Sequence, residues 1–326
     1  MTTDSPDADP PIFAGGVWGG RPPGGYDLVT EAVADHGLAL DELSVSELVT
    51  LMNERDATIP RAVRAALPAI TAAIEAASER IRRGGRLIYV GAGTSGRLGI
   101  LDAAEIPPTF GTNGDVVLGL IAGGPSAIIS SVEYAEDSDE AGAADLAALG
   151  PGPLDTVVGI ASSGTTPYVL GALRLAAEHG ALTVGLSCNL GTPLSAAAEY
   201  GIEIPVGPEI VTGSTRLGAG TAAKMVLNMF STISMVQLGK TYRTLMVDVK
   251  ATNAKLMRRA VRIVTLATGA DEDTARRALD ETDWHAKLAI AVIATGMSVP
   301  DARAALDAVG GVLRKVIEPT VGTGGR

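Results

Sequence analysis

The chain has 326 residues, of which 46% are hydrophobic and only 3% aromatic, and its formal net charge at pH 7 is −11. This length allows one large core with a small appendage, and an Ala, Val, Leu and Ile core is typical of helices packed on a parallel sheet. The acidic balance argues against nucleic acid and anionic membranes as partners, since both are polyanions. The single cysteine, Cys188, excludes intrachain disulfides, and no secretory signal or apolar run of about 18 residues is present. We therefore expect a cytoplasmic protein.

The first part of the chain predicts an arm followed by helices. Residues 1–27 are rich in Gly and Pro and lack apolar periodicity, so we expect them to be disordered. A capping-box pattern at 44–47 predicts a helix that ends near Glu54. A second helix is expected from Pro60 to the Arg-Arg-Gly-Gly stop signal at 82–85.

The middle of the chain predicts an α/β fold. Five short apolar strands are expected near 87–90, 116–121, 156–161, 182–187 and 202–206. Their alternation with helical stretches predicts a five-stranded parallel, Rossmann-like sheet flanked by helices. Long helices follow at 216–266, interrupted near Gly239, and three short helices are expected within 271–318, separated at Asp283 and Gly296. The expected organisation is an arm, N-terminal helices, an α/β domain with long helices and a small three-helix domain, at 1–27, 28–85, 86–268 and 269–326.

Glycine and hydroxyl residues follow several of these strands. Ligands of parallel sheets bind at the carboxyl ends of the strands, where backbone N–H groups and helix dipoles hold phosphates. Any one such loop is also explained by helix capping, but several loops at one sheet edge favour a sugar-phosphate site. The residues expected to bind the substrate are Gly93, Thr94, Ser95, Ser162, Ser163, Thr165, Thr166, Ser214 and Thr215.

The sequence disfavours a cofactor or metal. Residues 91–96 contain the Gly-x-Gly-x-x-Gly spacing of dinucleotide-binding turns, but no acidic residue ends a second strand, and Asp115 instead begins one. The histidines, His36, His179 and His285, lack metal-ligand spacing. The absence of a Walker lysine and of a Gly-x-Ser-x-Gly elbow disfavours ordinary kinases and serine hydrolases. We expect neither a cofactor nor a metal.

Two carboxylates are candidates for proton transfer. Glu105 lies between apolar residues and a Pro pair, and burial would raise its pKa toward neutrality, as a general acid or base requires. The alternative is a surface glutamate near the end of a helix. Glu133 and Glu136 are spaced to share one helix face, although such acidic faces are usually only solvated.

Six stretches together resemble the N-acetylmuramic acid 6-phosphate etherase family, whose core is a sugar isomerase (SIS) domain. They cover the chain between about 44 and 318 and comprise GAGTSGRLGILDAAEIPPTF at 91–110, LIAGGPSAI at 120–128, VEYAEDS at 132–138, SGTTPYV at 163–169, VGPEIVTGSTRL at 206–217 and LMVDVKATNAKL at 245–256.

The resemblance implies a lyase for an amino sugar phosphate. Such an enzyme cleaves the ether between D-lactate and C3 of the sugar, then adds water to give N-acetylglucosamine 6-phosphate. By motif match, Glu105 is expected to be the general acid and Glu136 the second catalytic carboxylate; the sequence leaves open which one removes the C2 proton. A homodimer whose sites are completed by the neighbouring subunit is also implied.

Other functions are compatible with the same loops. A non-catalytic sugar-phosphate regulator, like the related glucokinase regulatory protein, would keep the loops but has no need of both Glu105 and Glu136. An aldose–ketose isomerase would remove the same C2 proton without a leaving group at C3. Retention of both glutamates favours the lyase.

Three departures from the family pattern keep open one alternative, a lyase that acts on a related sugar. The family usually has a basic residue at the position of Thr165 and a lysine at that of Gly218, and its N-terminal T-E-x-R-N-P pattern here lacks Arg, Asn and Pro at 30–35. Each loss removes a donor, and a charge-assisted hydrogen bond contributes about 1.5–3 kcal/mol. Candidate phosphate anchors are Arg97, Arg216, Lys224 and Lys255.

Overall fold

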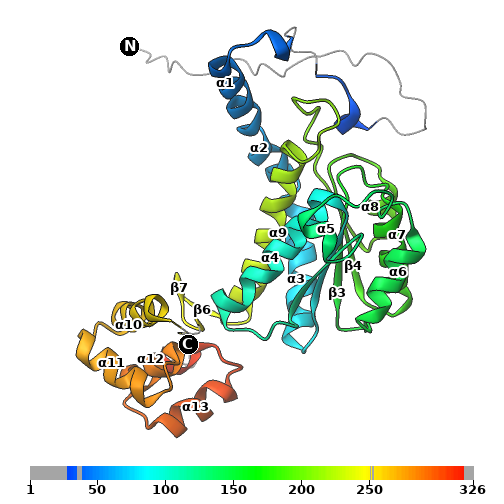
Figure 1. The fold of residues 1–326 in the computed structure, drawn as a ribbon. Helices are drawn as coiled ribbons and strands as arrows, with labels where there is room; N and C mark the ends of the chain where they lie inside the picture. The colour runs from blue at the N-terminus through cyan, green and yellow to red at the C-terminus, as the bar shows by residue number, and fades with distance from the viewer. Residues whose placement is uncertain (1–27, 35–38, 250, 252, 319–326) are drawn as a thin grey trace, which may run out of the picture.

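A five-stranded parallel sheet lies at the centre of the larger part of the molecule (Figure 1). The computed structural model describes residues 28–34, 39–249, 251 and 253–318; the predicted arm at 1–27 lies outside the described residues. The strands are β1 (Leu87–Gly91), β2 (Val117–Ile121), β3 (Thr156–Ile160), β4 (Leu182–Ser187) and β5 (Tyr200–Glu203). Each overlaps a predicted apolar run, and the predicted α/β fold is confirmed.

The strand order, β2-β1-β3-β4-β5, fixes where a ligand can bind. The chain passes from β1 to β2 on one side and returns to β3 on the other, so a crevice opens outside the carboxyl ends of β1 and β3. Alternate residues of β1 enter different cores: Leu87 and Tyr89 face one helical layer, and Ile88 and Val90 face the other.

Helices cover both faces of the sheet. On one face lie α3 (Leu67–Arg82), α4 (Gly93–Phe110) and α9 (Gly218–Gln237), and on the other α6 (Asp139–Ala148), α7 (Pro167–Glu178) and α8 (Pro193–Ala197) (Figure 1). The short α5 (Ser126–Ile129) follows β2. This layered arrangement keeps the carboxyl edge of the sheet free for loops.

The N-terminal helices differ from prediction at one point. They are η1 (Val29–Glu31), η2 (Leu40–Glu42), α1 (Val45–Asp56) and α2 (Ile59–Ala65). The capping box is confirmed, since the Glu47 N–H donates to Ser44 Oγ (3.4 Å) and the Ser44 N–H to Glu47 Oε2 (2.8 Å). The prediction of a single helix beyond Pro60 is wrong, because the helix is interrupted at Ala66, between α2 and α3. Pro68 has no N–H to donate and lies in the first turn of the new helix, where none is needed.

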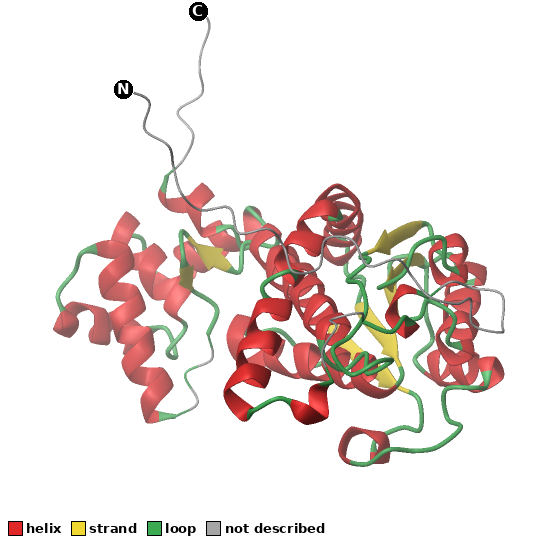
Figure 2. Cartoon of the chain, turned by 90° about the horizontal axis from the view of Figure 1, so that it is seen from above, coloured by secondary structure: helices red, strands yellow, loops and turns green. Residues whose placement is uncertain are grey.

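The C-terminal part forms a core of its own. It contains the hairpin β6 (Thr241–Tyr242) and β7 (Leu245–Met246), then α10 (Ala254–Thr268), α11 (Glu272–Glu281), α12 (Ala286–Thr295), α13 (Val299–Ala308) and α14 (Leu313–Ile317). Buried residues from Tyr242 to Leu313 share this core, and Figure 2 shows it beside the α/β part. The interruption near Gly239 is confirmed, but the boundary expected after residue 268 separates α10 from the helices that it packs against.

Within the described ranges, no single helix is long and apolar enough to cross a membrane; α12 and α13 meet the test only as a pair bent by 107°.

Candidate functional site

The turn between β1 and α4 places helix amides at the sheet edge. Helix α4 begins at Gly93, so Thr94 and Ser95 lie in its first turn rather than in a loop. The first intrahelical bond of this turn runs from the Gly96 N–H to the Ala92 carbonyl (3.2 Å), and Ala92 offers no capping side chain. The amides before Gly96 therefore point out of the helix end, as a bound phosphate requires.

The loop after β3 holds four of the predicted site residues. Ser163 Oγ accepts hydrogen bonds from the N–H (3.2 Å) and the hydroxyl (3.1 Å) of Thr165, which closes a tight turn before Thr166. Gly164 has φ +73°, and a Cβ there would lie 2.4 Å from Thr192 Cβ, so only glycine fits. Ser162, Ser163, Thr165 and Thr166 are all half-buried. Because β3 is the neighbour of β1, this loop borders the same crevice as α4.

The loop before α9 also reaches this edge. A Cβ at Gly220 would lie 3.4 Å from Thr94 Cγ2 and 3.5 Å from the Thr215 carbonyl oxygen. The first turns of α4 and α9 are therefore neighbours, and Ser214 and Thr215 lie close to Thr94. The structure thus brings together hydroxyl residues that the sequence predicted from three separate segments.

Residues that the site prediction did not include support these loops. Asn189, at the end of β4, donates from Nδ2 to the Ser162 carbonyl (2.8 Å) and to Thr30 Oγ1 (3.0 Å), and its Oδ1 accepts from the Thr30 N–H (3.3 Å). A Cβ at Gly213 would lie 3.1 Å from Glu31 Oε2. The Thr30-Glu31 pair thus docks between two site loops. The position of Asn189 after an apolar strand could have indicated a site residue, but not its partner Thr30. Cys188 is buried, which raises the pKa of its thiol to about 12 and makes it a poor nucleophile.

Glu136 lies beside the β3–α7 loop, although not on a helix. The helix predicted at 132–138 is wrong, because these residues form a turn in which Tyr134 has φ +62°, and α6 begins only after the Ser138 cap. The Glu136 carbonyl accepts a hydrogen bond from the Tyr168 N–H (3.1 Å) in the first turn of α7. The backbone of Glu136 is therefore fixed at the start of α7, and its side chain is exposed.

Glu105 is not in this cluster. It lies twelve residues after Gly93 on α4, about 18 Å along the helix axis, and its side chain is exposed. The expected burial of Glu105 is therefore wrong: the buried carboxylate of this helix is Asp102, one turn earlier. The two glutamates singled out from the sequence do not meet within one chain.

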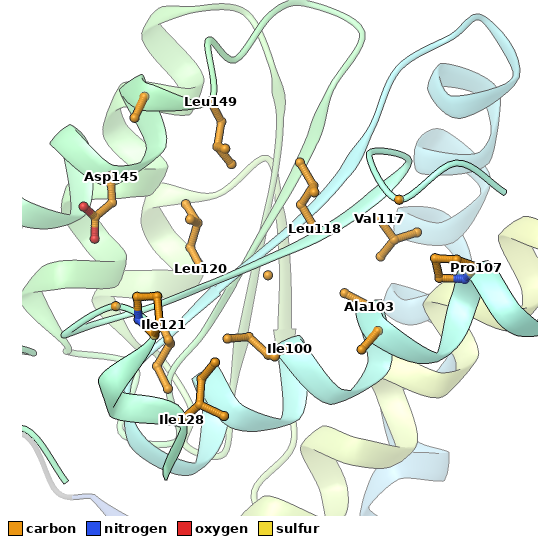
Figure 3. Close-up of a pocket in the computed structure, with 16 residues that line it drawn as sticks. Ile100, Ala103, Pro107, Val117, Leu118, Leu120, Ile121, Ile128, Asp145 and Leu149 are labelled. Carbon is orange, nitrogen blue, oxygen red and sulfur yellow. The ribbon is translucent and has the colours of Figure 1, made fainter. Parts of the chain in front are cut away.

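A groove runs along the outer side of α4 and the edge strand β2 (Figure 3). It has a volume of about 620 Å³ and is lined mainly by apolar side chains such as Ile100, Leu118 and Ile128. Leu101 on α4, and Ile129 and Tyr134 after β2, are large and exposed. Such a surface does not suit a sugar phosphate, but it suits protein contact.

The candidate phosphate anchors have different surroundings. Arg97 donates from Nε to the Ile128 carbonyl (3.1 Å) and from Nη2 to the Ser130 carbonyl (3.3 Å), so it fastens α4 to the segment after β2. Arg216, Lys224 and Lys255 are exposed. Among the residues that the structure describes, no group of three His, Cys, Asp or Glu side chains is arranged to hold a metal ion.

The fold and its strand-end loops define a SIS-domain protein. The family model described as "SIS domain" matches residues 134–233, and "Glucokinase regulatory protein N-terminal SIS domain" matches 69–177. A phosphoheptose isomerase structure from Francisella tularensis aligns with a TM-score of 0.48 and 18% identity over 60% of this chain and all of that one.

Full-length relatives identify the family more closely. The chain is 56% identical to an N-acetylmuramic acid 6-phosphate etherase of Streptomyces avermitilis over 89% of this chain and 93% of that protein. It is 53% identical to one of Mycolicibacterium smegmatis over 89% of this chain and 97% of the relative. The chain belongs to the N-acetylmuramic acid 6-phosphate etherase family, which confirms the resemblance seen in its motifs.

Proposed function

We propose that this protein is a carbon–oxygen lyase that cleaves the D-lactyl ether of N-acetylmuramic acid 6-phosphate. The products are D-lactate and, after hydration, N-acetylglucosamine 6-phosphate. The observation that carries the proposal is the identity of more than half of the residues to named etherases along nearly their whole length. Both Glu105 and Glu136 lie within the stretches that resemble the family, at 91–110 and 132–138, so the regulator alternative is not favoured.

The elimination requires two proton transfers, the hydration that follows requires two more in the reverse sense, and neither step is a redox step. In the open-chain sugar the C2 proton is acidic, because it lies α to the aldehyde. One carboxylate removes it, the C3–O bond breaks, and an acid protonates the departing lactate oxygen; water then adds to the C2=C3 double bond. The proposal gives the proton donor role to Glu105 and the remaining role to Glu136.

The phosphate is proposed to bind at the carboxyl edge of the sheet. The α4 amides around Gly93, Thr94 and Ser95 would receive it, with hydroxyls of the β3–α7 loop and of Ser214 and Thr215 around it. Neutral donors and a helix dipole hold phosphates without a metal. A cytoplasmic location, where phosphorylated sugars are retained, is part of the proposal.

Glu105 reaches this site only if a second copy supplies it. Within one chain, Glu105 is about 18 Å along α4 from the phosphate-binding end, farther than a hexose phosphate extends. The face that carries Glu105 also carries exposed Leu101 and adjoins the apolar groove of Figure 3. We therefore propose a homodimer in which α4 of one subunit brings Glu105 to the loops of the other.

The activity is tested by incubating the purified protein with N-acetylmuramic acid 6-phosphate and measuring D-lactate. We expect release with the phosphorylated sugar and little with N-acetylmuramic acid itself. The Glu105→Gln variant should lower kcat by a factor of about 10²–10⁴ while still binding N-acetylglucosamine 6-phosphate, because the amide cannot donate the proton. Undiminished turnover by this variant would contradict the role of Glu105.

A further inference from the structure

Arg55 joins the N-terminal helices to the chain after β5. It lies near the end of α1 with only 3% of its surface exposed. Its Nη2 donates to the Val206 carbonyl (2.6 Å), Nε and Nη2 both donate to the Pro208 carbonyl (3.1 Å each), and Nη1 donates to Thr58 Oγ1 (2.7 Å). A buried guanidinium with this many carbonyl partners fixes the path of residues 206–208.

The next residue along that path, Glu209, is fully buried and caps α9. Its two carboxylate oxygens accept hydrogen bonds from the N–H groups of Gly218 and Ala219, at 2.9 Å each. Burial lowers the pKa of Arg55, and the charge of Glu209 is the strongest influence that raises it again. The opposite charges of Arg55 and Glu209 therefore lie near each other at the N-terminus of α9 and attract each other.

Gly218 lies directly beside the side chains of Arg55 and Glu209. A Cβ built there would lie 3.0 Å from Glu209 Oε2, 3.1 Å from Ile59 Cδ1 and 3.2 Å from Arg55 Nη2. A side chain at 218 and the guanidinium of Arg55 thus compete for one volume beside Glu209. The lysine expected at 218 from the family pattern is absent, and an arginine from a distant part of the chain occupies its surroundings.

We propose that Arg55 is a positioning residue that supplies, from α1, the positive charge that a lysine at residue 218 would supply at the start of α9. It holds Glu209 against the α9 amides, and so sets the loop 211–217, which carries Ser214 and Thr215, toward the phosphate. The positive charge of the site has been relocated rather than lost. The nature of the ligand in this inference rests on the proposed function.

The test exchanges the position of the charge. The variants are Arg55→Met, and Arg55→Met combined with either Gly218→Lys or, as a matched control of similar size without charge, Gly218→Met. We expect Arg55→Met to weaken the binding of N-acetylglucosamine 6-phosphate, followed by calorimetry, by about tenfold or more. Gly218→Lys should restore the affinity to within about threefold of wild type, and Gly218→Met should not. Equal rescue by both would show that Arg55 only fills space and would overturn the proposal.

The same exchange made in the presence of Arg55 keeps the test independent of whether Arg55→Met folds. In the wild-type background, Gly218→Lys should melt at a lower temperature than Gly218→Met, by about 2 °C or more, because two cations then share one Glu209. In the Arg55→Met background the order should reverse. If Gly218→Lys melted at the same temperature as Gly218→Met or at a higher one while Arg55 is present, the inference would be overturned.

This outcome is separable from the proposed activity. If the wild-type protein neither binds the sugar phosphate nor releases D-lactate, the etherase assignment fails, while the reversal in melting temperature still decides the role of Arg55. If the wild type is active and the charge exchange has no effect, only the inference about Arg55 fails.

Discussion

The Asp102 carboxylate links α4, on which it lies, to β1 and α9 by hydrogen bonds. Its Oδ2 accepts a hydrogen bond from Tyr89 Oη on β1 (2.8 Å), and its Oδ1 accepts from Asn228 Nδ2 (2.7 Å) and Ser231 Oγ (3.1 Å) on α9. These bonds fix the rotation of α4 about its own axis. Since Glu105 lies one turn further along α4, the network decides which way Glu105 points.

Asp102 should give the protein a characteristic pH dependence. Burial raises its pKa, so the folded protein keeps this proton to a higher pH than the unfolded chain, whose carboxyl has a pKa of about 3.9. The corresponding stability is present below about pH 3.9 and is lost as the pH rises through the folded-state pKa. Asp102→Asn removes the titration. We expect the free energy of unfolding of wild type minus that of Asp102→Asn, from urea denaturation, to fall as the pH rises above about 3.9. If this difference in the free energy of unfolding stayed constant or rose with pH, the raised pKa of Asp102 would be contradicted.

The contacts that the sequence could not identify are those between residues far apart in the chain. Arg55 binds carbonyls 151 and 153 residues later, and Asn189 binds Thr30 across 159 residues. Local spacing carries no signal of such pairs. The exposure of Glu105 was mispredicted for a similar reason: apolar neighbours in sequence do not decide which side of a helix meets the core, and on α4 that side carries Asp102 and Ile106.

At the scale of elements, the turn at 132–138 positions Glu136. Its conformation depends on Tyr134, which has φ +62° and is 80% exposed. The Asp137 N–H donates to the Tyr134 carbonyl (3.2 Å) and closes the turn. A non-glycine residue in this left-handed conformation costs about 1–2 kcal/mol, so the segment stores strain beside the candidate site.

Substitutions at Tyr134 distinguish this turn from a helix. Both Tyr134→Gly and Tyr134→Ala remove the exposed ring, but glycine adopts a positive φ without strain. We expect Tyr134→Gly to be more stable than Tyr134→Ala by about 1 kcal/mol, measured by urea denaturation. A helix over 132–138 would give the opposite order by a similar amount, since alanine is the better helix former. Alanine as the more stable variant would therefore disprove the turn.

The strands were predictable and some helix limits were not, for physical reasons. Buried parallel strands require continuous apolar runs such as 87–90, which few other elements show at this length. The break at Ala66 was missed because Pro68 and the residues around it keep helical periodicity on both sides. The acidic run at 132–138 has helix-like spacing. Its sequence gives no sign that the Glu136 carbonyl accepts a hydrogen bond from α7 instead of from its own segment.

At the scale of the whole molecule, the separation of the two glutamates is the main constraint on function. The strand-end loops and Glu136 gather at one end of the sheet, whereas Glu105 lies on the outer side of α4 toward its other end. The proposed homodimer would reconcile these positions, because a closed two-fold interface would bring α4 of each subunit to the loops of the other. The apolar groove beside β2 gives such an interface a surface to bury.

Mixed dimers of two inactive variants test this arrangement. Glu105→Gln and Glu136→Gln chains, carrying different tags, are expressed together so that they pair at random. If each site takes Glu105 from one subunit and Glu136 from the other, one of the two sites in every heterodimer is intact. Half of the dimers are then heterodimers with half of their sites active, and the mixture should release D-lactate at about a quarter of the wild-type rate. The purified homodimers, mixed only after pairing, are the control and should stay inactive. If both glutamates served the site of their own chain, a heterodimer would hold no intact site, and co-expression would give no more D-lactate than the control.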